Sequence, residues 1–229
     1  KFQLAHQLQS IDKMVEIARE SEYPEEKWAK IGEIALSSGD MDTAEMALWA
    51  CKDYSGLLTY YTSFGNKNGM LKLADATKSG PFHNLNFLVN FQLGRLDECL
   101  NILIKTGKVA EATLFARTYV PSHVHDVLEQ WKKELLDTGK PRNAKTAEAL
   151  ADPPEYPNMF PDWEIGLKAE ELYEKQQDVL LPATKYPEVK ESMDWMIIDE
   201  LKEMNLEEEE IHPDQDDDSD EEEEEDIDM

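Results

Sequence analysis

Turn-forming residues recur at close intervals between Pro24 and Pro121, and this spacing limits what the chain can fold into. The clusters are Gly39-Asp40, Ser55-Gly56, Gly65-Asn66, Ser79-Gly80-Pro81, Gly94-Arg95 and Gly107-Lys108. Each interval has room for one short amphipathic helix and shows no alternating strand pattern. A run of short helices joined by tight turns predicts an all-α fold, an irregular α-solenoid of stacked helical hairpins. Such stacks present long surfaces to other proteins, which favours a scaffold over an enzyme.

Residues 28–51 fit a tetratricopeptide-like pattern of two short helices around a glycine turn. Trp28 and Ile31 fall on the side expected to face the partner helix, so we assign Trp28 to the core. Gly32 is small enough to let two helix backbones approach closely. Gly39 is expected to end the first helix in a left-handed conformation.

The turn that opens the second helix of this pattern recurs further along the chain. Gly94–Cys99 and Gly107–Ala112 share a glycine, a base, an aliphatic residue and a glutamate in the same order. Between them, residues 100–104 form a nearly continuous apolar stretch, which we expect near the centre of the stack. The repeats differ in length, so the predicted solenoid is irregular.

Helical patterns continue on both sides of this repeat. We expect one helix over Phe2–Arg19 and another from Ser122, as its N-cap, to Leu136. Further helices are expected over 144–151, 163–177 and 188–205. The prolines of residues 152–161 forbid a helix there, and the aromatic residues among them suggest an extended strap on the solenoid surface. The predicted parts are a solenoid over 1–139, the Pro-rich strap with terminal helices packed on it over 140–206, and a disordered acidic tail over 207–229.

The charge of the chain is strongly negative and unevenly spread. The formal net charge is −27, and residues 207–229 hold 16 of the 50 acidic residues and no Lys or Arg. The remaining body carries −11 and has no basic stripe, which argues against nucleic acid or anionic lipid as a partner. The tail has two interpretations, a solvating end or an electrostatic contact for a basic partner. Its Ser219 stands in an acidic context typical of acidophilic kinase sites and is a candidate for phosphorylation.

No pattern in the sequence points to catalysis, a cofactor or a metal. Cys51 and Cys99 fit small buried helix residues of a reducing compartment, although their positions leave a disulfide open. His123 and His125 are two residues apart, so on a helix they cannot share a ligand face. No apolar run is long enough for a membrane span, so direct membrane insertion is not expected. Lys1 is not an initiator methionine, and we expect the chain to be a C-terminal fragment.

Two tryptophans outside the regular repeats are candidates for contact with a partner protein. Trp163 and Trp195 belong to the predicted terminal helices, and aromatic anchors dominate protein interfaces. Simple packing of these side chains is the alternative for both.

Specific residues in this repeat resemble the C-terminal solenoid of the coatomer beta-prime family. The resemblance rests mainly on Phe91–Ser122, above all on Arg117-Thr118-Tyr119, and on Leu150–Pro153. The other matches, in the same order along the chain, lie at residues 54–58, 72–74, 147–156, 159–161 and 182–187. The resemblance covers roughly residues 1–190 and leaves out the acidic tail.

The resemblance implies a structural part of the COPI (coatomer) vesicle coat, without enzymatic activity. It implies pairing with the solenoid of the alpha subunit, contact with other coatomer subunits, and a role in Golgi-to-ER and intra-Golgi transport. It also implies a cytoplasmic protein held on Golgi and vesicle membranes indirectly, through a coat that a small GTPase recruits. The family's WD-repeat propellers, which bind cargo signals, have no counterpart here, so no cargo-binding residue can be assigned.

Three other interpretations compete with this one. A solenoid of another coat or of an intraflagellar-transport-type complex would share the architecture but should lack the specific residues around Arg117 and Leu150. A chaperone for basic proteins would depend on the acidic tail. An enzyme would need converging polar side chains, of which the sequence gives no sign.

Overall fold

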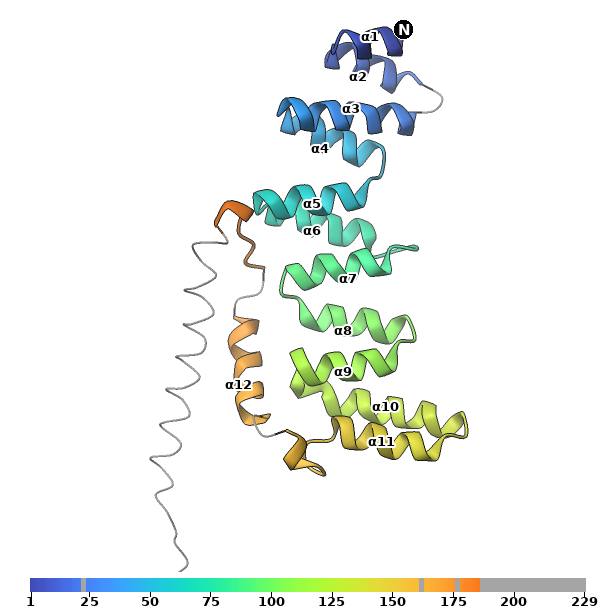
Figure 1. Ribbon diagram of the computed structural model, residues 1–229, viewed down its shortest axis with the longest axis vertical. Coiled ribbons are helices and arrows are strands. Elements are labelled where there is room, and N and C mark those ends of the chain that lie inside the picture. Colours follow the sequence, from blue (N-terminus) through green and yellow to red (C-terminus); the bar gives the residue numbers. More distant parts are fainter. Residues whose placement is uncertain (22–23, 161–162, 176–177, 186–229) are drawn as a thin grey trace, which may run out of the picture.

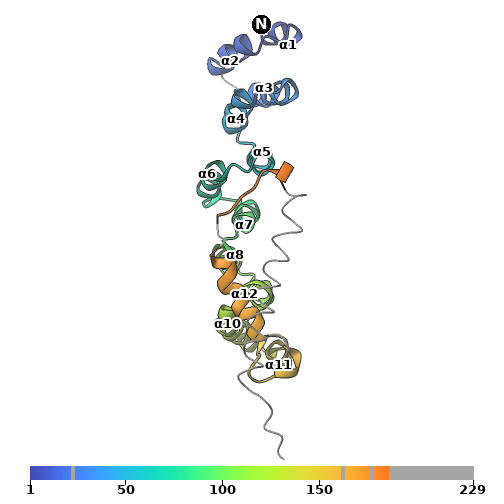
Figure 2. The ribbon, with the colours of Figure 1, turned by 90° about the vertical axis from the view of Figure 1, so that its left-hand side faces the viewer.

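The computed structural model describes residues 1–21, 24–160, 163–175 and 178–185, and within these ranges all regular structure is helical. Short helices stack one on another from the N-terminus downward (Figure 1). The view turned by 90° shows that the stack is narrow (Figure 2). The predicted all-α, irregular solenoid is therefore confirmed, whereas the residue bounds of its three expected parts stay a prediction. Residues 188–229, with the last expected helix and the acidic tail, lie outside the described ranges.

Eleven helices of the described part form the stack. They are α1 Phe2–Gln7, α2 Ile11–Arg19, α3 Pro24–Ser38, α4 Met41–Ala50, α5 Tyr54–Phe64, α6 Lys67–Thr77, α7 His83–Gln92, α8 Leu96–Lys105, α9 Val109–Tyr119, α10 Val124–Asp137 and α11 Pro141–Ala151. Most of these helices contact chiefly the one before and the one after in the sequence. Neighbour-only contact is the defining property of a solenoid.

Two turns of the stack show how the sequence stops one helix and starts the next. Gly39 and Gly65 adopt φ values of +79° and +63°, which a residue with a side chain rarely adopts. The residue after each glycine is an N-cap: Asp40 accepts from the N–H of Thr43, and Asn66 from the N–H of Gly69. The Gly-Asx pair therefore ends one helix and begins another within two residues.

One predicted turn lies elsewhere. Ser55 and Gly56 are inside α5, and the chain turns at Lys52, whose φ is +58°. Asp53 then caps α5 by accepting from the N–H of Gly56 at 2.9 Å. The turn was predicted at the wrong position because the prediction relied on glycine, and a lysine in the left-handed conformation gives no signal in the sequence.

The single helix expected over Phe2–Arg19 is two helices. The chain breaks after Gln7, and Gln9 takes a positive φ of 50° while the N–H of Ser10 bonds to the carbonyl of Ala5. This break folds α1 back against α2, which buries Ala5 in one cluster with Met14 and Ala18. A continuous apolar stripe did not reveal the break, because both halves keep the helical period.

The helix after α10 also begins earlier than expected. Expected to begin at residue 144, it is α11 and starts at Pro141, where proline's missing N–H costs nothing. Residues 152–160, the described part of the segment expected to be extended, contain a short 3-10 turn at Pro157–Met159 and otherwise lack regular structure. The following helix, α12, spans Trp163–Glu174, close to the expected 163–177.

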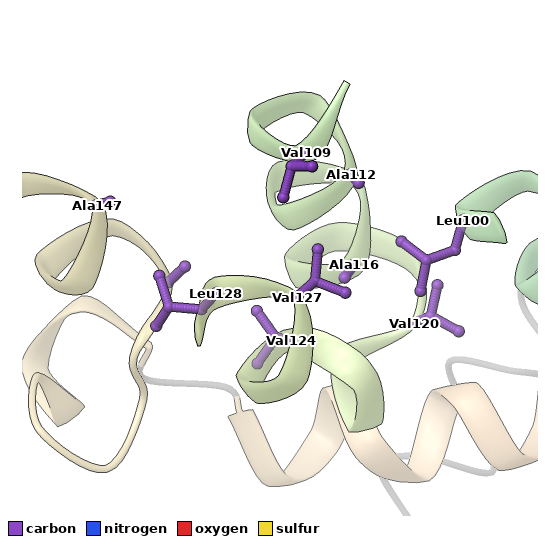
Figure 3. Packing of buried hydrophobic residues seen from close by; sticks show 10 residues of the cluster. Leu100, Val109, Ala112, Ala116, Val120, Val124, Val127, Leu128 and Ala147 are labelled. Carbon is purple, nitrogen blue, oxygen red and sulfur yellow. The ribbon is translucent and has the colours of Figure 1, made fainter. Parts of the chain in front are cut away.

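Three separate clusters of buried side chains lie along the stack. The N-terminal cluster includes Trp28, as expected, and the middle cluster surrounds Tyr61. Figure 3 shows the third, in which a valine and alanines of α9 meet Val124, Val127 and Leu128 of α10, with Leu100 from α8 and Ala147 from α11. Small side chains let the helices approach: a Cβ on Gly32 would lie 3.5 Å from that of Ala47. Each cluster holds together only its own few helices.

Gly107 tests the turn geometry. Its φ is +74° and no atom lies within 4 Å of a Cβ placed there, so Gly107→Val should lower the free energy of unfolding by about 1 kcal/mol or more through backbone strain alone. Gly166, inside α12, has ordinary backbone geometry and room for a Cβ, so Gly166→Ala should not destabilise. Chemical denaturation of both variants measures this, and equal effects would contradict the assigned cap.

Candidate binding surface formed by the returning C-terminal segment

After α11 the chain reverses and runs back along the stack. Helix α12 lies along the ends of the stacked helices, and a 3-10 turn at Ala183–Lys185 reaches α5 (Figures 1 and 2). We refer to residues 163–175 and 178–185 as the return segment. This segment brings residues from the end of the described chain onto helices far earlier in the sequence. It is thus the main departure from neighbour-only contact.

A buried carboxylate holds α12 to the stack. Glu170 is 8% exposed; its Oε2 accepts from the N–H of Ser122 at 2.8 Å, and its Oε1 accepts from the Ser122 hydroxyl at 2.6 Å. The expectation that Ser122 caps its own helix is wrong: the chain makes a 3-10 turn at Pro121–His123, and α10 begins at Val124 without a side-chain cap. Glu170 instead supplies the negative acceptor that the first N–H groups of a helix need.

A second polar contact lies at Asp178. Its N–H donates to the carbonyl of Leu93 at 2.8 Å, and its carboxylate accepts from Arg95 Nε at 2.7 Å and Nη2 at 3.0 Å. Lys67 Nζ lies 3.7 Å from the same carboxylate. The hydrogen bond from Arg95 lowers the pKa of Asp178 below its ordinary value. A bidentate arginine pair fixes orientation as well as charge, so this contact sets where the return segment crosses α7 and α8.

The last residues of the return segment pack directly on α5 and its turn. Leu180 packs against the middle cluster of buried residues. A Cβ on Gly65 would lie 2.6 Å from the carbonyl carbon of Leu181 and would also overlap Pro182. Gly65 therefore serves twice, as a left-handed turn and as the place where the returning backbone touches the stack.

Arg117 links α9 to the Pro-rich strap. Its Nη1 donates to the carbonyl of Leu150 at 2.7 Å and its Nη2 to that of Met159 at 3.2 Å. The guanidinium also lies 4.4 Å from the ring centre of Phe160, a cation–π contact. Phe160 in turn meets Trp163 edge to face at 5.6 Å. The strap therefore lies on the solenoid surface, as its aromatic residues indicated.

The structure describes only one of the candidate site residues. Trp163 is half-buried at the start of α12 and packs against the third cluster, and its role in a partner contact stays a prediction. Trp195 and Ser219 lie outside the described residues.

Between the return segment and the stack lies an apolar groove of about 420 Å³. One wall carries Phe91 of α7 and Tyr119 of α9, which form an aromatic ladder with Phe87 and Phe115 behind them. Ring centres along this ladder are 4.9 to 6.3 Å apart. The other wall is α12, with Gly166, Ala169 and Tyr173, and Pro121 also lines the groove. Its surface suits contact with another side chain or segment, because aromatic walls give large contact area at little entropic cost.

Reactive chemistry is not evident in the described part of the chain. No three His, Cys, Asp or Glu side chains gather there in a way that could hold a metal ion. Burial raises the pKa of the Cys99 thiol to about 12, which makes it a poor nucleophile. Cys51 is half-buried at the end of α4. None of the described helices combines the length and apolar character that a membrane crossing requires.

Sequence reasoning missed Glu170 and Asp178, the two acids that hold the return segment. In a chain with 50 acidic residues nothing marks these two, and each depends on a partner far away in sequence. The ladder had a weak signal: Phe87 and Phe91, like Phe115 and Tyr119, are four residues apart and share a helix face.

Comparison with known proteins places the chain beside coatomer subunits. The family model described as the COPA/B TPR domain matches residues 1–132. A putative coatomer subunit beta'-3 of Oryza sativa subsp. japonica is 39% identical over 215 residues, which cover 94% of this chain and 23% of that protein. Coatomer subunit beta'-2 of Arabidopsis thaliana is 38% identical over 92% of this chain and 22% of its own length. Coatomer subunit beta' of Pongo abelii is 37% identical over 88% of this chain and 22% of its own length.

The chain thus spans under a quarter of the length of these relatives. The resemblance drawn from the residues around Arg117 and Leu150 is confirmed by them.

Asp178→Asn should loosen the return segment without disturbing the stack. Asparagine tolerates the φ of +62° found here but cannot form the charged pair with Arg95. Because the folded-state pKa of Asp178 is lowered, its stabilisation is present above the unfolded pKa and is lost as pH falls through the folded value. The pair is partly exposed, so we expect amide exchange in 178–185 to rise about three- to tenfold at neutral pH. Glu25→Gln, which removes the exposed pair with Lys52, is the control; exchange unchanged in 178–185 would contradict the anchor.

Gly65→Ala should cost more stability than Gly107→Ala. Both substitutions strain a left-handed residue, but only the first also drives a methyl group into Leu181 and Pro182. The difference in unfolding free energy should be about 1–3 kcal/mol, the usual cost of overpacking. Denaturant unfolding gives the two values, and hydrogen exchange should place the extra loss in 178–185. Equal losses would mean that the return segment does not rest on this turn.

Proposed function

This chain belongs to the COPA/B TPR domain family, and from that premise we propose that it is a structural part of the COPI vesicle coat, contributed by a coatomer beta-prime subunit. The observation that carries the proposal is the extent of the similarity. Residues 1–132 match the family model, and the similarity to coatomer beta-prime continues over 94% of the chain. Similarity of that extent includes most of the return segment as well as the stack.

In this proposal the chain supplies spacing and contact surface. Helices that contact mainly their neighbours make an elongated body whose length is set by the number of repeats. The return segment ties α5, α8 and the 3-10 turn before α10 together through Pro182, Asp178 and Glu170, which stiffens this part against bending. A stiff rod with exposed helix faces is suited to hold other coat components at fixed distances.

We propose the alpha-subunit solenoid as the direct partner, with other coatomer subunits as further neighbours. The protein would act on the cytoplasmic face of Golgi and COPI vesicle membranes, in Golgi-to-ER and intra-Golgi transport. Attachment would be indirect, through the assembled coat that a small GTPase recruits. The chain spans 22–23% of its relatives, so these roles belong to a longer protein of which it resembles one part.

Co-purification with the solenoid of a coatomer alpha subunit tests this proposal. We expect the two to elute together on size exclusion, and expect deletion of residues 207–229 to leave the association unchanged. Dependence on that deletion would instead point to the acidic tail as the binding element, as in a chaperone for basic proteins. If the chain does not associate with the alpha-subunit solenoid, even within a full-length subunit, the proposed pairing is wrong.

A further inference from the structure

The groove beside α12 is lined by aromatic side chains that remain partly uncovered. Phe91, Tyr119 and Tyr173 keep 37%, 43% and 50% of their surface exposed. They face a space of about 420 Å³, which falls within the size range of pockets that bind ligands or side chains. Tyrosine and phenylalanine are among the residues that contribute most to protein interfaces.

The one charged residue among the described residues that line the groove is acidic. Glu170 lines it and is bonded by the uncharged N–H and hydroxyl of Ser122, so its charge is not neutralised by that contact. A small recess adjoining the groove is lined by Glu174 and Asp97. Asp97 has His123 at 3.6 Å, and this pair is ionic only when the imidazole is protonated. Three carboxylates therefore surround one end of an apolar groove.

Neither cavity is lined by a lysine or arginine of the described residues. Arg95 points its guanidinium at Asp178, and Arg117 is bonded to the carbonyls of Leu150 and Met159. The arginines closest in sequence to the groove are thus already engaged in holding the fold. A cation that binds in the groove must therefore belong to a binding partner.

Charge also decides between the possible occupants. Residues 186–229 of this chain contain 22 acidic residues and two lysines, so their charge opposes entry into an acidic groove. A second copy of a chain with net charge −27 is disfavoured in the same way. A segment of a different protein, with positive charge, is the occupant that fits.

We propose that this groove binds a segment of a partner protein in which an aliphatic or aromatic anchor stands next to an arginine or lysine. The anchor inserts between the ladder and α12, against Tyr119 and Tyr173. The cation meets Glu174 and Asp97 and lies over an aromatic face, an arrangement that favours positive charge. The inference concerns the chemistry that the groove accepts and is independent of which coat subunit pairs with the stack.

Selection of short random peptides displayed on phage against the full chain tests this binding mode. We expect the enriched peptides to combine an apolar anchor with arginine or lysine, and to bind more weakly as salt rises. Affinities of the synthesised peptides are then measured by fluorescence anisotropy. Tyr173→Ala and Glu174→Lys, both at exposed residues, should each weaken binding about tenfold. Leu136→Ala removes a 55% exposed side chain of α10 outside the groove and should leave peptide affinity unchanged.

Four results would overturn the proposal. They are the absence of any enriched peptide, enrichment without cations, equal weakening by Leu136→Ala, and displacement by a synthetic peptide of residues 186–229. Circular dichroism of each variant separates lost binding from lost folding. Measuring alpha-subunit association on the same variants keeps the two proposals distinct, because peptide binding can be lost while association persists, or the reverse.

Discussion

Each helix of this stack buries its apolar side mainly against its neighbours in the sequence, and the other features of the molecule follow from that constraint. No central core joins the two ends of the described part; three clusters each hold a few helices. The direction of every helix is therefore fixed by the turn before it. Left-handed residues such as Gly39 and Gly107 therefore help to orient the helices, which a large core would do in a globular domain.

The return segment compensates for the weakness of neighbour-only packing. Asp178 meets Arg95 across 83 positions of sequence, and Glu170 meets Ser122 across 48. These contacts couple parts of the chain that are far apart in sequence, whereas the stability of a solenoid otherwise comes from its repeats and the interfaces between neighbouring repeats. The same segment creates the groove, because α12 forms the wall opposite the aromatic ladder. One structural element thus both stiffens the rod and gives it a shaped surface.

Three basic residues help to hold this architecture. Arg95 and Arg117 fix the return segment and the strap, and Lys132 joins α10 to α11 through Glu148, which helps raise the pKa of that lysine. In the proposed binding mode, the carboxylates beside the groove would let the chain discriminate among partners by charge, because acidic segments are repelled while basic apolar segments are attracted.

The sequence by itself determined the helix stack, the burial of Trp28, the turns at Gly39, Gly94 and Gly107, and the left-handed conformation of Gly39. These are local properties: helical periodicity and the sign of φ are set by residues within a few positions. The sequence also marked Arg117 and Leu150 as distinctive, but only the tertiary structure showed that they bond to each other across 33 positions. The break after Gln7 is a local turn that the continuous helical period hides. The partner of Ser122 and the groove were decided by where distant segments meet. That meeting depends on how residues 152–160 turn the chain back, which no local pattern encodes.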